Sequence, residues 1–236
     1  MLKILLALLL VAAAASACAR SPAASQEPRE STSHVQPAGG ASSASVRIEF
    51  GGGSLTVGAL DDAQGTLSRM TYEGPPALQP QSSYQLRDGA GDLEYVIGDA
   101  HRRQNQYADM RVLLARDLPL ALSVDAGGAQ STLDLTALRI ARFELQAGAS
   151  NTRVRLPEAA GPTVVNVEGG AARLVFDVPP EVAADVQVSG VLDTRSIDEA
   201  RFRLLGSGRY RSPEYETATN RVELRLELGA ANLTVR

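Results

Sequence analysis

The sequence predicts an all-β solenoid, and three observations carry that prediction. Beyond Val46, apolar residues alternate with polar ones over short stretches, and each stretch breaks at a glycine before the alternation resumes, which is the pattern of strand, tight turn and strand. The pattern recurs at a spacing near 21 residues, which is typical of layers that stack on one another. Of the 236 residues, 44% are apolar but only 4% are aromatic and none is Trp, so we expect a core of Leu, Val and Ala.

One template describes each repeat. It has an apolar anchor, a second apolar residue two places earlier, a glycine three places later and a third apolar residue nine places later. Six anchors satisfy the template: Ile48, Leu86, Val124, Leu145, Val167 and Leu226. A seventh anchor, Val188, departs from it because Gly190 comes one place early and Val191 takes the glycine position. Successive anchors are 38, 38, 21, 22, 21 and 38 residues apart, which predicts a basic turn of about 21 residues and three longer turns.

The residues beside each anchor test the prediction, because alternation requires them to point outward. All of them are polar or charged: Arg47 and Glu49, Gln85 and Arg87, Ser123 and Asp125, Glu144 and Gln146, Asn166 and Glu168, Gln187 and Ser189, Arg225 and Glu227. The anchors should therefore form an interior column when turns stack. We expect the recurrent glycine at a corner that needs positive φ. Asp134, Arg155 and Asp177 are expected to form an outward charge ladder.

Residues Pro119 to Pro157 carry a resemblance to a known family. Their repeats of the Leu-x-Leu-x-x-Gly-Ala type and the strand-ending pair Leu156 and Pro157 resemble the core of the bacterial toastrack domain family. That family is related to the C-terminal domain of LiaF-type cell-wall-active-antibiotic response proteins. The resemblance extends over about Val46 to Arg236.

The resemblance implies a right-handed, single-stranded β-helix-like stack that faces the outside of the bacterial membrane. It also implies a role in envelope-stress sensing or protein assembly. The several transmembrane helices of LiaF-type proteins have no counterpart in this sequence. A direct restraint of a sensor kinase is therefore not carried over.

The N-terminus has the features of an export signal. Lys3 gives a positive start, residues 4–15 form an apolar run and Ala15–Ala17 is a small-residue cleavage site, as in secretory signals. The run is shorter than the roughly 20 residues that a membrane-spanning helix needs. Cys18, the only cysteine, follows directly and resembles the acylated first residue of a bacterial lipoprotein, although Ala15 stands where leucine is preferred. Ordinary secretion is the alternative, because Ala-Ser-Ala also suits the general signal peptidase.

We expect three segments: a signal peptide ending in a lipidated Cys18 (1–18), a disordered linker (19–45) and a β-solenoid domain (46–236). The linker is rich in Ala, Ser, Pro, Gln and Gly, a composition that cannot offset the entropy of ordering. It would span roughly 30 Å and hold the domain off the membrane. The predicted location is extracytoplasmic, and where two membranes exist Ala19, in place of an aspartate, favours the outer one.

Nucleic acid is not expected as a partner, because the net charge is -4 and the arginines do not cluster, which leaves no basic surface for a phosphate backbone. No cofactor or metal is expected either. The sequence has only two histidines, and neither a metal cluster nor a catalytic triad can be built from them. His34 falls in the predicted linker and His101 in a predicted loop.

Three short motifs favour a structural interpretation over a functional one. Gly51–Ser54 superficially resembles a phosphate cradle, but no Gly-Lys-Ser/Thr follows and the repeat already explains Gly51,. Asp88–Asp92 resembles a calcium-binding β-roll turn, yet it occurs once where stacked copies are needed,. Asp61 and Asp62 are adjacent carboxylates at the start of a loop, and a solvated turn is the expected structure there.

Two functions from different classes stay open. The favoured one is a non-catalytic, lipid-anchored envelope module for scaffolding, adhesion or stress sensing, with envelope proteins or polymers as partners. Binding would use the three longer turns, at about Ala59–Ser83, Gly98–Ala121 and Asp198–Glu223, because surface insertions often carry recognition. Their candidate residues are Tyr72, Tyr107, Tyr210 and Tyr215, although these tyrosines could equally cap the core.

The alternative is a carbohydrate-active β-helix enzyme. Asp92 and Glu94 would share one side of a strand, and Asp134 would lie on the next turn. Sugar-processing grooves usually need aromatic platforms, which this chain is poorly supplied with, since it has six Tyr, four Phe and no Trp. Function must in any case be argued from a site and not from the fold.

Overall fold

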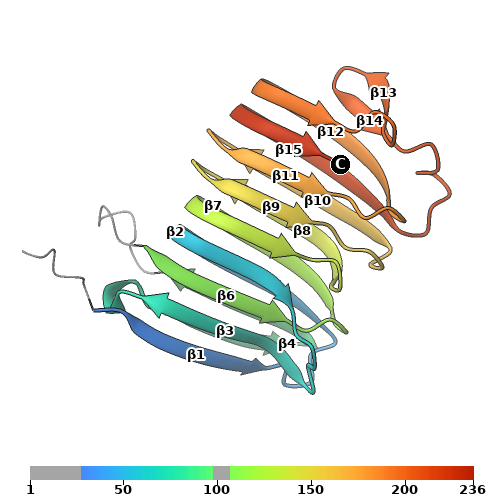
Figure 1. Ribbon diagram of the computed structural model, residues 1–236. Helices are drawn as coiled ribbons and strands as arrows, with labels where there is room; N and C mark the ends of the chain where they lie inside the picture. The colour runs from blue at the N-terminus through green and yellow to red at the C-terminus, as the bar shows by residue number, and fades with distance from the viewer. Residues whose placement is uncertain (1–27, 98–106) are drawn as a thin grey trace, which may run out of the picture.

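The computed structural model describes residues 28–97 and 107–236, and this part of the chain is built almost entirely of strands (Figure 1). One 3-10 turn, η1, spans Pro76–Leu78. The strands are β1 (Glu30–Pro37), β2 (Ser43–Ala59), β3 (Thr66–Gly74), β4 (Pro80–Arg87), β5 (Ala90–Ile97), β6 (Ala108–Leu114), β7 (Pro119–Asp134), β8 (Arg139–Ala147), β9 (Asn151–Arg155), β10 (Pro162–Gly169), β11 (Arg173–Asp177), β12 (Ala183–Ile197), β13 (Arg203–Gly206), β14 (Arg209–Arg211) and β15 (Arg221–Val235).

Each layer of the stack, called a rung here, has two arms that meet at a corner. In two rungs the arms are separate strands, β8 with β9 and β10 with β11, whereas β2, β7, β12 and β15 each supply both arms of their rung. Neighbouring rungs pair in parallel and in register, so that Val165 lies opposite Phe143 and Val167 opposite both Leu145 and Leu226. The structure therefore confirms the predicted β-helix-like solenoid.

The core lies between the two arms. Six of the seven predicted anchors are buried there: Ile48, Val124, Leu145, Val167, Val188 and Leu226. Residues flanking these anchors point outward, as predicted, and form rows in register across the rungs. The buried residues Leu135, Leu156 and Val178, which follow β7, β9 and β11, belong to the same core.

The remaining predicted anchor, Leu86, is wrong. Leu86 lies in β4, which pairs antiparallel with β5 and has no rung beyond it in the described chain, and its side chain is 42% exposed. The true counterpart of Ile48 is Tyr95, which is buried and lies directly opposite it in β5. β4 imitates the repeat because a strand that covers one edge alternates in the same way as a strand within a rung.

The rungs do not stack in the order of the sequence. The arms formed by β5 and β6 lie on one side of β2, and β7 lies on its other side. At the opposite end, β15 inserts between the β10–β11 rung and β12. Two of the longer turns thus place a later strand beside an earlier one, which the spacing of anchors alone does not reveal.

The predicted linker at 19–45 is wrong over its second half. Residues 30–37 form β1, which pairs antiparallel with β3 along its whole length, and β2 begins at Ser43. Arg29 is already tied to the domain, since its guanidinium donates to the carboxylate of Asp109 at 2.7 Å and to the Glu73 carbonyl at 3.1 Å. The export signal, Cys18 and the first part of the linker lie outside the described residues.

At the far end of the stack, the β13–β14 hairpin covers the first arm of β12 and encloses a buried carboxylate. Asp185 accepts hydrogen bonds from Arg209 at 2.9 and 2.6 Å and from Arg211 at 2.8 and 2.5 Å. Burial alone would raise the pKa of Asp185, but these hydrogen bonds and the two positive charges outweigh it and hold the pKa below its ordinary value of 3.8,.

The corner glycines are explained by packing and not by the predicted positive φ. Gly51, Gly127, Gly148, Gly170 and Gly229 stack in a column, and none of them has positive φ. A Cβ on Gly148 would lie 2.5 Å from the Gly127 carbonyl oxygen, whereas one on Gly170 would lie 3.7 Å from that of Gly148. Positive φ occurs instead at Gly53 and Gly190, beside the column.

The packing of the glycine column predicts that substitution of glycine by alanine destabilises the fold to different extents at different positions. Gly148→Ala should lower the free energy of unfolding by about 1–3 kcal/mol, because the added methyl group overlaps the neighbouring carbonyl. Gly170→Ala is the matched control and should change it by no more than about 0.5 kcal/mol, since its Cβ makes an ordinary contact. Urea unfolding of both variants measures this, and equal losses would contradict the close-packed column.

The Asp185 cluster predicts a pH-dependent stability. Asp185→Asn should lower the free energy of unfolding by roughly 1–3 kcal/mol at neutral pH, a range that allows for the partly exposed arginines. Because the folded pKa is depressed, the contribution of the carboxylate is fully present above 3.8 and is lost as the pH falls through the lower folded value. The difference in free energy of unfolding between the wild type and Asp185→Asn, measured by urea unfolding, should therefore disappear in acid.

Asp193→Asn removes an exposed carboxylate from the same strand and controls for the change in net charge. If the difference in free energy of unfolding between wild type and Asp185→Asn keeps its full size at the lowest pH measured, the carboxylate is not the stabilising group.

Candidate functional site

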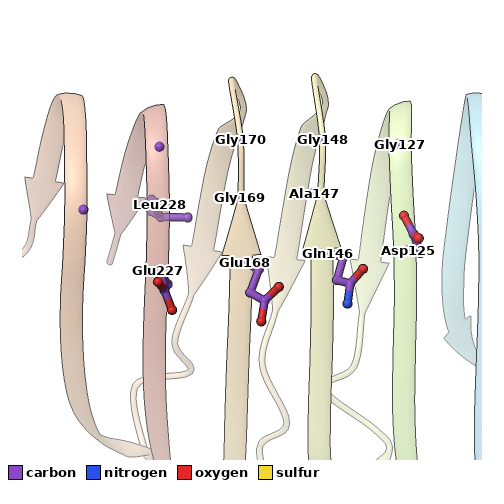
Figure 2. Close-up of a pocket in the computed structure, with 12 residues that line it drawn as sticks. Asp125, Gly127, Gln146, Ala147, Gly148, Glu168, Gly169, Gly170, Glu227 and Leu228 are labelled. Atoms are coloured by element: carbon purple, nitrogen blue, oxygen red, sulfur yellow. The ribbon is translucent and has the colours of Figure 1, made fainter.

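A row of acidic and amide side chains runs across neighbouring rungs next to the glycine corner (Figure 2). Asp125 lies in register with Gln146, Gln146 with Glu168, and Glu168 with Glu227. Figure 2 shows these side chains on one side of successive parallel strands, below Gly127, Gly148 and Gly170. Register places them there, because each follows a buried anchor by one residue in its own rung,.

The glycine column forms one wall of an open groove beside this row. The groove has a volume of about 650 Å³ and is lined by the acidic row, by the corner glycines and by Gly190 and Leu228. Because glycine has no side chain, the backbone of the corner is accessible along the whole groove. We call this feature the corner groove. It could accommodate an extended chain that crosses the rungs.

The acidic row differs in its ion pairing from neighbouring side chains on the same arm. Beside it, the side chains of Arg142 and Glu144 pair at 2.7 Å, and those of Arg225 and Glu223 at 2.5 Å. Among the ion pairs of the described residues, none involves Asp125, Glu168 or Glu227. Glu168 and Glu227 face each other on paired strands, an arrangement of like charges that is destabilising.

The predicted charge ladder is confirmed on the second arm. Arg155 lies between Asp134 and Asp177 in register and bonds to the Asp134 carboxylate at 3.0 Å. Asp177 pairs with Arg153 at 2.8 Å and with Arg236 at 2.6 Å. Partial burial opposes ionisation, but these arginines hold the pKa of Asp177 below its ordinary value,. Both carboxylates of the ladder are therefore paired with arginines.

Two of the four predicted binding tyrosines belong to the core. Tyr72 is buried, its hydroxyl donates to the Pro75 carbonyl at 2.7 Å, and burial raises its pKa to about 12. Tyr210 is also buried, with the guanidinium of Arg195 5.6 Å from its ring centre. Of the two uses open to these residues, the structure supports capping of the core.

The other two tyrosines are more accessible but far apart. Tyr107 is exposed beside β6, and Tyr215 is partly buried with the Arg211 guanidinium 5.1 Å from its ring centre. They lie at opposite ends of the stack, because β6 and the β12–β14 region flank it. The four candidates therefore do not form one site, and the corner groove contains none of them.

The carboxylates of the enzyme alternative are not brought together. Asp92 and Glu94 do share the outer side of β5, and Glu94 lies 3.7 Å from Arg47. Asp134 belongs to the second arm of β7, where it pairs with Arg155, so it is not a neighbour of Asp92. The prediction that placed Asp134 on the next turn beside them is wrong, because the corner separates the two arms.

The short motifs have structural roles. Asp88 and Gly89 form the turn of the β4–β5 hairpin with φ of 51° and 78°, values expected of an Asp-Gly hairpin turn. In the Gly51–Ser54 stretch, Gly53 has φ 116° and a Cβ there would lie 2.0 Å from the Ala108 carbonyl oxygen. Asp61 lies in an exposed loop, 3.6 Å from Arg116.

His34 is a strand residue and not a linker residue. It faces Met70 in β3, its ring meets that of Tyr95 edge-on at 6.2 Å, and its Nε2 is buried without a hydrogen-bond partner among the described residues. His101 and Cys18 lie outside the described residues. Within the described residues there is no group of three or more His, Cys, Asp or Glu side chains that could hold a metal ion.

Sequence reasoning missed the corner groove, although a signal for it was present. The residues after the anchors were recognised as outward and polar, but the row Asp125, Gln146, Glu168 and Glu227 was not read across the repeats. Aligning the residue after each predicted anchor would have shown four carboxylates, at Glu49, Asp125, Glu168 and Glu227, against one cation, at Arg87. In the described chain, no helix has the length and apolar character needed to span a bilayer.

Comparison with solved structures supports the fold. A protein of Clostridium sporogenes, provisionally named a cell adhesion protein, superposes with a TM-score of 0.74 at 17% identity, over 89% of this chain and 100% of its own. A provisionally named adhesin of Bacteroides fragilis matches 89% of this chain and 98% of its own at 7% identity, with a TM-score of only 0.33. No curated protein matches this chain.

The sequence also matches a family model. Residues 24–177 match the family described as the N-terminal domain of toast_rack, DUF2154. This stretch covers more than half of the chain and includes β1 to β11. The match confirms the resemblance drawn from Pro119 to Pro157, and the chain belongs to the toast_rack family.

Proposed function

We propose that this protein is a non-catalytic scaffold or adhesion module of the bacterial cell envelope, which holds its partner in the corner groove. The observation that carries the proposal is the row Asp125, Glu168 and Glu227 beside a wall of bare glycine backbone. The folded protein would be more stable with neutral side chains at these outward positions, because like charges on paired strands repel. A partner with basic or hydrogen-bonding groups would relieve that repulsion.

The scaffold itself favours binding over catalysis. Rungs in register repeat the same chemistry at about 4.8 Å intervals, so the groove offers a line of equivalent groups and not a converging set of different ones. Catalytic sites instead need a nucleophile, an acid or base and a charge-stabilising group within reach of one atom. The proposal also agrees with the provisional name of the Clostridium sporogenes protein, whose likeness shows the fold.

Anchoring at the membrane is the second part of the proposal. Cys18, acylated behind its export signal, would attach the chain to the outer face of a membrane. Since Arg29 is already bound to β6, only residues 19–28 separate the anchor from the domain. Ten residues reach at most about 35 Å when fully extended. The domain would therefore stay close to the membrane, where its partners would be other envelope proteins or polymers.

Removal of the anchor tests the location. Cys18→Ser should move the protein from the membrane fraction to the soluble extracytoplasmic fraction, because the thiol is the acylation site. Its unfolding transition should match that of the wild type. Fractionation and metabolic labelling with a fatty acid measure both effects, and a variant that stays membrane-bound and labelled would overturn the anchor.

Neutralisation of the row tests the groove. The triple variant Asp125→Asn, Glu168→Gln, Glu227→Gln should lose the envelope components that cross-link to the wild type in intact membranes and are identified by mass spectrometry. Its free energy of unfolding should rise by a few tenths of a kcal/mol at low salt, because repulsion within the row is removed.

The matched control neutralises three carboxylates that are in ion pairs on the same arm: Glu94→Gln, Glu144→Gln and Glu223→Gln. It changes the net charge equally and should keep the cross-linked components. If the triple variant and the wild type recover the same set, the corner groove is not the binding surface.

A further inference from the structure

The second arms form a sheet that ends in two open strand edges. The order across this arm is β1, β3, β6, β2, β7, β9, β11, β15 and β12. Among the described residues, no strand pairs with the outer edge of β1 or with that of Val191–Ile197 in β12. Figure 1 shows β1 and β12 at opposite ends of the stack. Unpaired edges of this kind are templates for pairing with another chain.

The two open edges run in the same direction. β1 is antiparallel to β3, and β3 is antiparallel to β6, so β1 runs with β6. From β6 to Val191–Ile197 every pairing on this arm is parallel. A second copy that is shifted along the stack axis without being turned over would therefore bring its β1 parallel to Val191–Ile197 of the first.

The ends of the two arms are stepped in a complementary way. Beyond β2 the second arm adds β6, β3 and β1, whereas the first arm adds only β5 and β4. Beyond β12 the first arm adds β14 and β13, whereas the second arm adds no strand among the described residues. One end thus projects on the arm where the other is recessed, as a head-to-tail contact requires.

Exposed apolar side chains gather at the same two ends. The described residues include six large apolar side chains that are between 42% and 79% exposed: Val35, Leu86, Tyr107, Val191, Leu204 and Leu205. Val35 and Leu86 lie on the outermost strands of one end, and Val191, Leu204 and Leu205 on those of the other. None of the six lies on β7, β8, β9, β10, β11 or β15, the rungs between.

We propose that copies of this chain associate head to tail, with β1 and β4 of one copy against β12 and β13 of the next. The sheet would continue from chain to chain, and because the contact joins two different surfaces the assembly stays open. This inference goes beyond a scaffold or adhesion role and does not depend on the corner groove or on Cys18.

The size of the end face sets the strength of the contact. The arms of a rung, such as β10 and β11, have eight and five residues, which gives lengths of about 26 and 17 Å, and a packed sheet is about 10 Å thick. The contact therefore buries on the order of 900 Å² in total, which is small for a stable interface. Association should be weak in solution and stronger where a membrane concentrates the copies.

Sedimentation velocity of the full chain in a mild detergent tests the proposal. The wild type should form a series of oligomers that grow as its concentration is raised. Val35→Asp with Leu86→Asp blocks one end, and Val191→Asp with Leu205→Asp blocks the other. Each double variant should sediment as a monomer, with a dissociation constant raised at least tenfold. The control is Val164→Asp with Val175→Asp on the middle strands β10 and β11, which should keep oligomerising.

An equimolar mixture of the two end variants decides the geometry. Each has one intact end of opposite kind, so the mixture should give a dimer and nothing larger. A wild type that stays monomeric at every concentration would overturn the proposal. An end variant that dimerises on its own would also overturn it, because its two copies could then only join through the same end. Loss of association in the middle-strand control, as in the end variants, would overturn it as well.

Discussion

The parallel register of the rungs is the constraint on which the rest of this structure depends. Strands about 4.8 Å apart place each side chain directly beside the residue at the same position in the next rung. Inside, this register stacks Ile48, Val124 and Leu145 into a continuous core. At the corner, the same register brings the backbone of one rung so close to Gly148 that a side chain would collide with it. One geometric rule thus sets both the apolar column and the glycine column.

On the outer face, the rule forces each side chain to be compatible with two neighbours. One row of the second arm meets this demand with opposite charges, since Arg155 lies between Asp134 and Asp177. The row containing Glu168 and Glu227 does not, although glutamine would fit there, as Gln146 in the same row shows. Departures from local consistency are expected where function requires them, which is why we propose this row, and not the ion-paired ladder, as the binding surface.

The sequence predicted the features that depend on register and missed those that depend on how the ends are closed. The solenoid and six of its anchors follow from alternation and period, because burial between stacked rungs imposes both. Leu86 satisfied the same template in an edge strand, and the alternation of β4 could not be told from that of a rung. β1 was missed because its inward residues Thr32, His34 and Gln36 are polar, so composition indicated a linker where pairing with β3 supplies the stability.

Closure of the ends explains why the rungs depart from the order of the sequence. A terminal rung would leave one side of its core uncovered, and solenoids accordingly need caps. Here β5 and β6 pair with β2, and their other edges are covered by antiparallel β4 and β3, which precede them in the sequence. At the far end Phe202 is buried in the core, and Tyr210 of β14 is buried opposite Val186 of β12. These caps cover the ends of the core, yet within the described residues they leave β1 and Val191–Ile197 as unpaired strand edges of matching direction. Capping of the core and capping of the sheet are therefore separate requirements, and the part of the chain that the structure describes meets only the first.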